Sequence, residues 1–299
     1  MNPATDGNAY LDIDDLSIVL KHLPSQRLLR SVGLHVKPGE VRGLVGESGA
    51  GKSMIGKTIF DILPRAVEIV EGKVTLGGED LLALPESARR RVIARTSALI
   101  PQDPLTALNP VRRIESQITD RLTKILGFSK ADARERARTL LDEVHIRDPE
   151  RVLKAYPHQL SGGMRQRVLI AAAFAAEPKL IVADEPTTAL DVTVQKQILR
   201  LIAEMQARHQ TALLFVTHDL GVVAKICQNV TVLYGGMVVE DTDVKALFAN
   251  PRHAYTRALI AATPRYDCPE ESLVPVPVAV IEATRAEIAA ADTAWRAGR

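Results

Sequence analysis

The sequence has few cysteines, little net charge and no long apolar run. Its two cysteines, Cys227 and Cys268, form no C-x-x-C motif and no disulfide framework, which suits a reducing cytosol. A net charge of +2 argues against a dedicated nucleic-acid binder, which would carry a strongly basic surface. Residues 1–8 are polar and lack the basic and apolar segments of a signal peptide.

The longest apolar-rich run, Val168 to Ala176, is only about half as long as a membrane span. We therefore expect any role at a membrane to be peripheral and to depend on a partner. With 299 residues, 46% hydrophobic and 25% charged, the composition is typical of a soluble globular protein. One large domain, or a domain with an extension, is expected.

Short β-branched runs alternate with helical patterns, which predicts an α/β fold with a largely parallel sheet. Val111 to Ala155 differs, because it is helical and charged, and we interpret it as a helical insertion. Glu68 to Leu76 is expected to form a hairpin with its turn at Glu71-Gly72, and Gly235-Gly236 to form a second hairpin turn. The other predicted strands are Leu11–Leu20, Leu28–Val36, Val41–Val45, Ser97–Ile100, Leu180–Ala183, Leu213–Thr217 and Val230–Tyr234.

A glycine-rich loop between a predicted strand and a predicted helix matches the pattern G-x-x-x-x-G-K-[ST]. Glycines let backbone N–H groups surround phosphate oxygens, and the following helix directs the positive end of its dipole at the same anion. The lysine is expected to meet the β- and γ-phosphates, and the last serine to ligate Mg²⁺. A chance match is the alternative, which the flanking strand and helix disfavour. The predicted nucleotide-binding residues are Gly46, Glu47, Ser48, Gly49, Ala50, Gly51, Lys52 and Ser53.

Two carboxylates, Asp184 and Glu185, end the apolar strand that begins at Leu180. Because the carboxyl ends of parallel strands line the ligand crevice, we expect this pair to face the phosphate loop. Asp184 would hold Mg²⁺, and Glu185 would activate the attacking water. An acidic helix start is the alternative. His218 follows another apolar strand and is expected to donate to the γ-phosphate or to orient the water, although a packed histidine is the ordinary outcome there.

Leu160-Ser161-Gly162-Gly163-Met164-Arg165-Gln166 forms a second candidate anion site, with a serine hydroxyl and two glycine amides opening a helix. One phosphate loop needs no second γ-phosphate site for the same nucleotide. We therefore expect this site to serve the nucleotide of a partner subunit.

Taken together, the chain from about residue 10 to 264 resembles the ATP-binding subunits of ABC transporters. Six motifs occur in the order of that family: the phosphate loop, Gln102, the segment from Leu160 to Gln166, the acid pair, Ala189-Leu190-Asp191, and His218. The resemblance implies a P-loop ATPase fold with a mixed sheet core, an antiparallel β layer and a helical subdomain over about residues 103–159. Residues 265–299 would be a C-terminal extension.

The resemblance also implies an ATPase that works as a head-to-tail dimer around two ATP molecules with Mg²⁺. Ser161, Gly162, Gly163 and Gln166 would contact the partner's ATP, and Asp191 would lie at the dimer interface. Gln102 would sense the γ-phosphate and Mg²⁺. The dimer would bind two membrane permease subunits on the cytoplasmic face of the bacterial inner membrane and would act indirectly with a solute-binding protein. The family favours two different ATPase subunits over two copies of one chain.

Four segments are similar to the dipeptide and oligopeptide importer branch: Gln102 to Pro110, Tyr156 to Gln159, Asp191 to Gln195, and His253 to Leu259. Uptake of peptides is therefore expected, with nickel, opines or glycosides as alternative cargo. A non-transport ABC ATPase acting on DNA or ribosomes is disfavoured, because the chain has no coiled-coil insertion and no second cassette. A degenerate cassette is disfavoured too, because the acid pair and His218 are all present.

Two features depart from the family pattern. No aromatic residue occurs over Val19 to Leu23, where many members stack a ring on adenine, so the adenine-stacking residue stays unassigned. Cys268 is the single cysteine of the C-terminal region, and one thiolate cannot hold an iron–sulfur centre, so none is expected.

Overall fold

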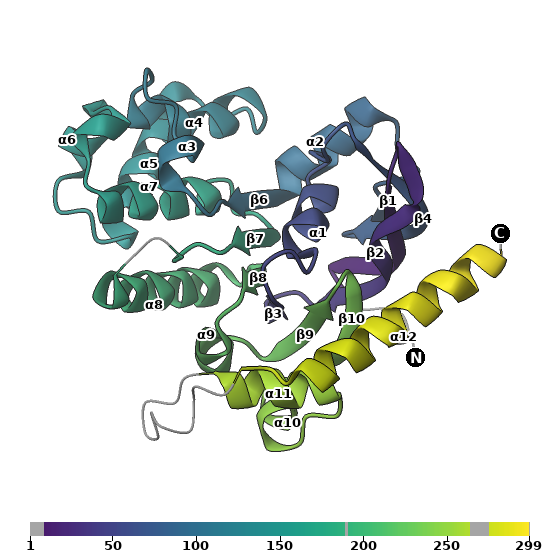
Figure 1. Ribbon diagram of the computed structural model, residues 1–299. Helices are drawn as coiled ribbons and strands as arrows, with labels where there is room; N and C mark the ends of the chain where they lie inside the picture. Colours follow the sequence, from purple (N-terminus) through teal and green to yellow (C-terminus); the bar gives the residue numbers. More distant parts are fainter. Residues whose placement is uncertain (1–8, 189–190, 264–274, 299) are drawn as a thin grey trace. The chain divides into compact units, whose positions relative to one another are not determined.

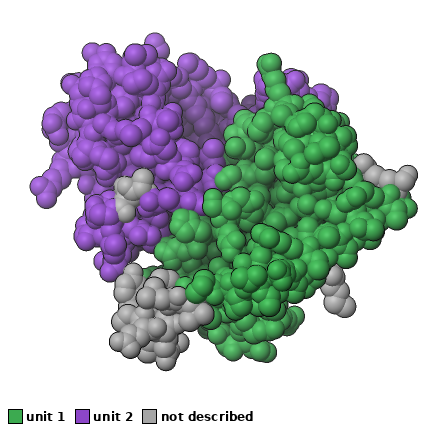
Figure 2. All heavy atoms as spheres, in the orientation of Figure 1, with its two compact units in different colours: residues 1–84, 215–299 green, residues 85–214 purple. Residues whose placement is uncertain are grey.

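The computed structural model describes residues 9–188, 191–263 and 275–298. The chain divides into two compact units (Figure 2). Unit 1 comprises residues 1–84 and 215–299, and unit 2 comprises residues 85–214. Within the described ranges, no helix combines the length and apolarity that crossing a bilayer requires.

An antiparallel sheet with the strand order β2-β1-β4-β5 forms one layer of unit 1 (Figure 1). The long strands pair side by side, with Leu11 opposite both Val36 and Leu76. Leu11, Ile13, Val36 and Leu76 are buried, so this layer has its own apolar face. The strands are β1 (Leu11–Leu20), β2 (Leu23–Val36), β4 (Val67–Leu76) and β5 (Glu79–Asp80).

The hairpin predicted over Glu68 to Leu76 is wrong, because this segment is a single strand, β4. Gly72 has φ +104°, but it lies where the pairing of β4 with β1 shifts register, between Asp14 and Ser17. A Cβ at Gly72 would stand 2.6 Å from the Cα of Leu16. The glycine therefore lies opposite a bulge in β1, where two residues of β1 face one residue of β4 and the β1 backbone comes too close for a side chain.

The second sheet has the order β10-β9-β3-β8-β7-β6. Strands β3 and β9 run parallel, as do β6 and β7, whereas β10 folds back on β9 across Gly235-Gly236, as expected. This mixed sheet and the antiparallel layer confirm the predicted fold class. The boundary between the two units falls within β8. The strands are β3 (Val41–Val45), β6 (Ser97–Ile100), β7 (Leu180–Asp184), β8 (Ala212–Thr217), β9 (Asn229–Tyr234) and β10 (Met237–Asp243).

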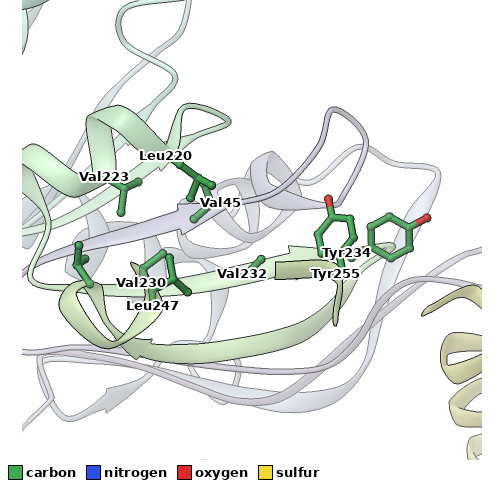
Figure 3. Packing of buried hydrophobic residues seen from close by; sticks show 9 residues of the cluster. Val45, Leu220, Val223, Val230, Val232, Tyr234, Leu247 and Tyr255 are labelled. Atoms are coloured by element: carbon green, nitrogen blue, oxygen red, sulfur yellow. The ribbon is translucent and has the colours of Figure 1, made fainter. Parts of the chain in front are cut away.

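The apolar core of unit 1 joins β3 and β9 to helices from the C-terminal part of the chain (Figure 3). Val45 and Val232 contact this cluster from the strands, and Val223, Leu247 and Tyr255 contact it from three helices. Burying each of these side chains contributes about 1.5–3 kcal/mol. The helices of unit 1 are α1 (Lys52–Ile59), α9 (Leu220–Ile226), α10 (Val244–Ala249), α11 (Ala254–Ala262) and α12 (Val278–Ala297).

A buried ion pair network crosses unit 1 beside this core. Arg42 Nη1 donates to Asp241 at 2.5 Å, and Arg42 Nε donates to Glu40 at 3.1 Å. Thr231 Oγ1 also donates to Asp241, at 2.6 Å. Each buried charge therefore has an opposite charge and a hydrogen bond, which buried ions require.

Unit 2 is mostly helical, and its residues 111–155 carry helices without strands, as predicted. Ser129 begins α5 by accepting the Asp132 N–H at 3.1 Å, as an N-cap residue does. In α8 the residues Ile198, Leu201, Ile202 and Met205 are buried as one apolar face. The helices are α2 (Glu86–Thr96), α3 (Pro104–Ala107), α4 (Ile114–Lys124), α5 (Lys130–Glu143), α6 (Pro149–Lys154), α7 (Gly162–Phe174) and α8 (Val192–His209), with a 3₁₀ turn at Pro157–Gln159.

The bulge at Gly72 predicts a specific loss of stability. We expect Gly72→Ala to lower the free energy of unfolding by about 3 kcal/mol, because a Cβ adds a backbone clash to the strain of positive φ. Gly78→Ala is the matched control: Gly78 has φ +90°, yet no heavy atom of the described residues lies within 4 Å of its Cβ position. Its loss should stay near 1–2 kcal/mol. Equal losses in urea unfolding would contradict the steric explanation.

Candidate nucleotide-binding and hydrolysis site

The predicted phosphate loop lies in unit 1 between β3 and α1. Two of its glycines are required by close packing. A Cβ at Gly46 would stand 2.2 Å from the Leu233 carbonyl oxygen, and a Cβ at Gly51, whose φ is +104°, would stand 2.7 Å from Leu29 Cδ2. The loop backbone is therefore pressed against β9 and β2, while Glu47, Ser48 and Gly49 are exposed.

Lys52 is almost buried, with 5% exposure, and its ammonium group lies inside the loop. Nζ donates to the carbonyl oxygens of Gly46 at 2.7 Å and Glu47 at 3.0 Å. Ser53, the next residue of α1, is exposed. The first turn of α1 carries no acidic residue, so no carboxylate of its own neutralises the positive end of the helix dipole. This arrangement favours an anion in front of the loop.

Two predicted residues lie at the carboxyl ends of two parallel strands in unit 2. Ile100 of β6 pairs with Ala183 of β7, so Gln102 and Asp184 follow that register at the same edge of the sheet. Gln102 is exposed and Asp184 is half-buried. Their amide and carboxylate oxygens, like the Ser53 hydroxyl in unit 1, are the oxygen donors that Mg²⁺ prefers.

Glu185 adopts a left-handed backbone conformation, with φ +46°. A non-glycine residue with positive φ is uncommon, and such strain concentrates at functional sites. The turn after it closes locally, because Thr188 Oγ1 donates to Glu185 Oε2 at 2.9 Å and the Thr188 N–H donates to the Glu185 carbonyl at 3.3 Å. The carboxylate is thereby oriented at the end of β7.

Ser161 begins α7 and accepts the Met164 N–H at 3.3 Å. Ser161 and Gly162 are exposed. Among the described residues, no heavy atom lies within 4 Å of a Cβ built at Gly162, and only Val194 Cγ1, at 3.7 Å, approaches one at Gly163. Packing within the described chain therefore does not require these glycines, and they leave the helix start open to an outside ligand.

Gln166 lies inside unit 2 with 1% exposure. Its Nε2 donates to the Pro186 carbonyl at 2.8 Å, which ties α7 to the turn after Glu185. Sequence reasoning missed this tie, because nothing in the sequence pairs residues of two separate motifs. The expected contact of Gln166 with a partner's ATP stays a prediction.

The remaining predicted residues lie at the starts of helices. Asp191 begins α8 and accepts the Val194 N–H at 2.9 Å, whereas Ala189-Leu190 lie outside the described residues. His218 is exposed after β8, and the next residue, Asp219, begins α9 by accepting the Gly221 N–H at 2.8 Å. The phosphate loop is in unit 1, as is His218, whereas Gln102, the acid pair and Ser161 to Gln166 are in unit 2.

The two departures from the family pattern have different outcomes. Lys21 and His22 form the exposed turn between β1 and β2, and Leu23 is 46% exposed, so the adenine-stacking residue stays unassigned. Burial raises the pKa of the Cys227 thiol to about 12, so this partly buried side chain is a neutral thiol at neutral pH. Cys268 lies outside the described residues, and the expectation of no iron–sulfur centre stays a prediction.

Comparison with known proteins gives two family matches. Residues 29–188 match the family model described as ABC transporter, and residues 239–288 match the one described as oligopeptide/dipeptide transporter, C-terminal region. The chain is 45% identical to a probable peptide ABC transporter ATP-binding protein of Sinorhizobium fredii, over 99% of this chain and 88% of that protein. It is 43% identical to the dipeptide transport ATP-binding protein of Escherichia coli, over 90% and 83%.

A solved structure of an ATP-binding cassette has a similar fold. A dimeric ATP-binding cassette in a post-hydrolysis state, bound to ADP and phosphate, superposes with a TM-score of 0.68. It is 25% identical and covers 78% of this chain and 98% of that one.

The contact between Gln166 and Pro186 predicts that hydrolysis depends on Gln166. We expect Gln166→Leu to lower the free energy of unfolding by about 1–3 kcal/mol, because the buried Pro186 carbonyl loses its donor. Turnover should fall because the turn after Glu185 is no longer held. Gln206→Leu is the control, since buried Gln206 Nε2 donates to Thr211 O at 2.9 Å, outside the predicted site residues. It should cost similar stability and leave ATP turnover intact; equal turnover in both variants would contradict the role of Gln166.

Proposed function

The chain belongs to the ABC transporter family, and on that premise we propose that it is the ATP-hydrolysing subunit of an importer for peptides. One observation carries the proposal. The chain has two candidate anion sites: a phosphate loop packed against strands of its own unit, and an open start of α7 at Ser161. The first is built to hold a nucleotide, and the second leaves its glycines to a ligand from outside.

Within one chain, the roles follow from the chemistry of the side chains. The Lys52 ammonium neutralises the β- and γ-phosphates, and its bonds to two loop carbonyls hold it ready for them. Glu185 accepts a proton from the attacking water, and Thr188 keeps its carboxylate in one orientation. The imidazole of His218 donates to the γ-phosphate or orients the water.

Ser53, Gln102 and Asp184 would hold the Mg²⁺ ion. All three offer oxygen atoms, and two of them lie at one edge of the sheet in unit 2, which supports this assignment. When bound, the ion neutralises charge on the phosphates.

We infer that the working form is a head-to-tail dimer, most simply a heterodimer with a sister ATPase subunit. Ser161, Gly162, Gly163 and Gln166 would then complete the partner's ATP site, and Asp191 would lie at the interface. ATP touches both subunits only in the closed dimer, so it favours closure by those additional contacts, and hydrolysis removes them. The solved cassette with a TM-score of 0.68 is described as dimeric, which supports a dimer for this chain.

The complex would act on the cytoplasmic face of the bacterial inner membrane with two permease subunits, and indirectly with a solute-binding protein. Peptides are proposed as the cargo because the relatives named above are peptide and dipeptide transport proteins, and because residues 239–288 match the C-terminal region of that group. Nickel, opines and glycosides are the alternatives. Uptake of a labelled dipeptide series by the reconstituted complex, with each alternative as competitor, tests the cargo directly.

The proposed role of Glu185 predicts that a substitution there separates ATP binding from ATP turnover. We expect Glu185→Gln to keep ATP affinity within about twofold, lower turnover at least a hundredfold and accumulate a closed dimer, because only the proton acceptor is lost. Binding, phosphate release and size-exclusion chromatography measure these three properties.

The matched control is Glu177→Gln in the same unit. Glu177 also has positive φ, +48°, and pairs with Arg136 at 3.1 Å. It should retain normal turnover. Phosphate release by Glu185→Gln at the unaltered rate would falsify Glu185 as the catalytic base.

A further inference from the structure

The C-terminal helix α12 is anchored on unit 1 by a carboxylate between two arginines. Asp292 Oδ1 accepts Arg27 Nε at 2.7 Å and Arg30 Nε at 3.0 Å, and its Oδ2 accepts Arg30 Nη2 at 3.0 Å. Trp295 lies one turn further along, with its ring centre 4.7 Å from the Arg27 guanidinium carbon, and its Nε1 donates to Glu71 at 2.7 Å. The end of α12 is thus held on β2 and β4 (Figure 1).

The anchor is charge-assisted rather than only apolar. Burial alone would raise the pKa of Asp292, but the hydrogen bonds from Arg30 and Arg27 outweigh it and hold that pKa below its ordinary value. Asp292 is therefore ionised at neutral pH and neutralises part of the charge of two guanidinium groups. Removing it leaves those two cations facing each other, with the Arg27 side chain only 2% exposed.

Arg30 connects this anchor to the turn between β9 and β10. Its Nη1 donates to the Gly235 carbonyl at 2.6 Å, and its backbone N–H donates to the Gly236 carbonyl at 2.7 Å. Helix α12 also reaches the turn directly, since a Cβ at Gly235 would stand 2.6 Å from Ile288 Cδ1. The turn is therefore held between β2 and α12.

The turn between β9 and β10 also contacts the phosphate loop directly. The Gly236 N–H donates to the Ala50 carbonyl at 2.9 Å, and the Leu233 carbonyl occupies the space where Gly46 lacks a side chain. Tyr234, beside the turn, packs against Tyr255 of α11, with the ring centres 4.4 Å apart and the rings tilted by 49° (Figure 3). Burial, and then the negative charge of Glu47, raise the pKa of Tyr255. Residues from the C-terminal part of the chain therefore approach the loop at several points.

Helix α12 and the phosphate loop also face a common pocket. Its volume is about 370 Å³, and Arg285 and Ile288 of α12 line it together with Arg30, Gly235 and the loop residues 47–50. The helix therefore lies beside the loop rather than on a distant surface of unit 1.

We propose that α12 positions the phosphate loop for nucleotide binding, with Asp292 as the positioning residue and Arg30 and the β9–β10 turn as its connection to Ala50. A loop whose amides are already held in place loses less conformational freedom when it binds phosphate, so its affinity is higher. The proposal rests on the proposed function in one respect, namely that this loop binds nucleotide.

The test uses the full chain and ADP with Mg²⁺, which binds without turnover, measured by titration calorimetry. We expect Asp292→Asn to raise the Kd for ADP roughly fivefold or more, because the coupling between two sites is typically of that size. In ATP hydrolysis the KM should rise while kcat stays within about twofold, since Glu185 is untouched. By reciprocity, ADP should slow amide hydrogen exchange in residues 278–297 of the unaltered chain.

Asp241→Asn is the matched control, because it breaks a buried carboxylate–arginine contact of the same unit that has no bond to the phosphate loop. Both variants should lose stability, but only Asp292→Asn should shift the Kd. Arg30→Gln tests the same connection while Asp292 keeps its bond to Arg27, and it carries the test if Asp292→Asn does not fold. Trp295, the single tryptophan of the sequence, reports the docking of α12 by its emission.

If Asp292→Asn or Arg30→Gln folds and binds ADP as tightly as the Asp241→Asn control, α12 is only a structural brace and the proposal is wrong. If the unaltered chain does not bind ADP at all, the proposed function fails instead. The two failures are therefore distinguishable.

Discussion

The candidate nucleotide site depends on close backbone contact between the phosphate loop and its neighbours in unit 1. The backbone at Gly46 meets the Leu233 carbonyl, and that at Gly51 meets Leu29, at distances that leave no room for side chains. A loop that directs its amides outward gives up the hydrogen bonds of regular structure, so neighbouring strands must hold its shape. The Lys52 ammonium adds two bonds from inside the loop. These contacts therefore fix the backbone shape of the loop before any ligand binds.

In unit 2, the predicted site residues are positioned by helix starts and strand ends. Ser161 and Asp191 each accept a backbone N–H of the helix that they begin. Gln166 then joins the helix after Ser161 to the turn after Glu185. The open start of α7 and the turn that follows Glu185 are therefore joined by one buried hydrogen bond.

Buried charge is used in unit 1 to specify contacts between distant segments. Asp292 joins α12 to β2, and Asp241 joins β10 to β3 through Arg42. Buried ion pairs add little net stability over apolar packing, but an unpaired partner is costly. Such pairs therefore select one docking position among several that apolar contacts alone would allow.

The sequence by itself determined the features that depend on neighbouring residues: the phosphate loop between its strand and helix, the helix start at Ser161 and the turn at Gly235-Gly236. In each case local spacing dictates backbone shape or burial. Only the tertiary structure decided that Gly72 lies opposite a bulge of β1 rather than in a turn, because the pairing of β4 with β1 makes the contact that requires a glycine there. The same holds for Gln166 with Pro186, and for Arg27 with Asp292, which lie 265 residues apart. Contacts of this kind form only after the chain has folded, because no periodicity or spacing links their partners.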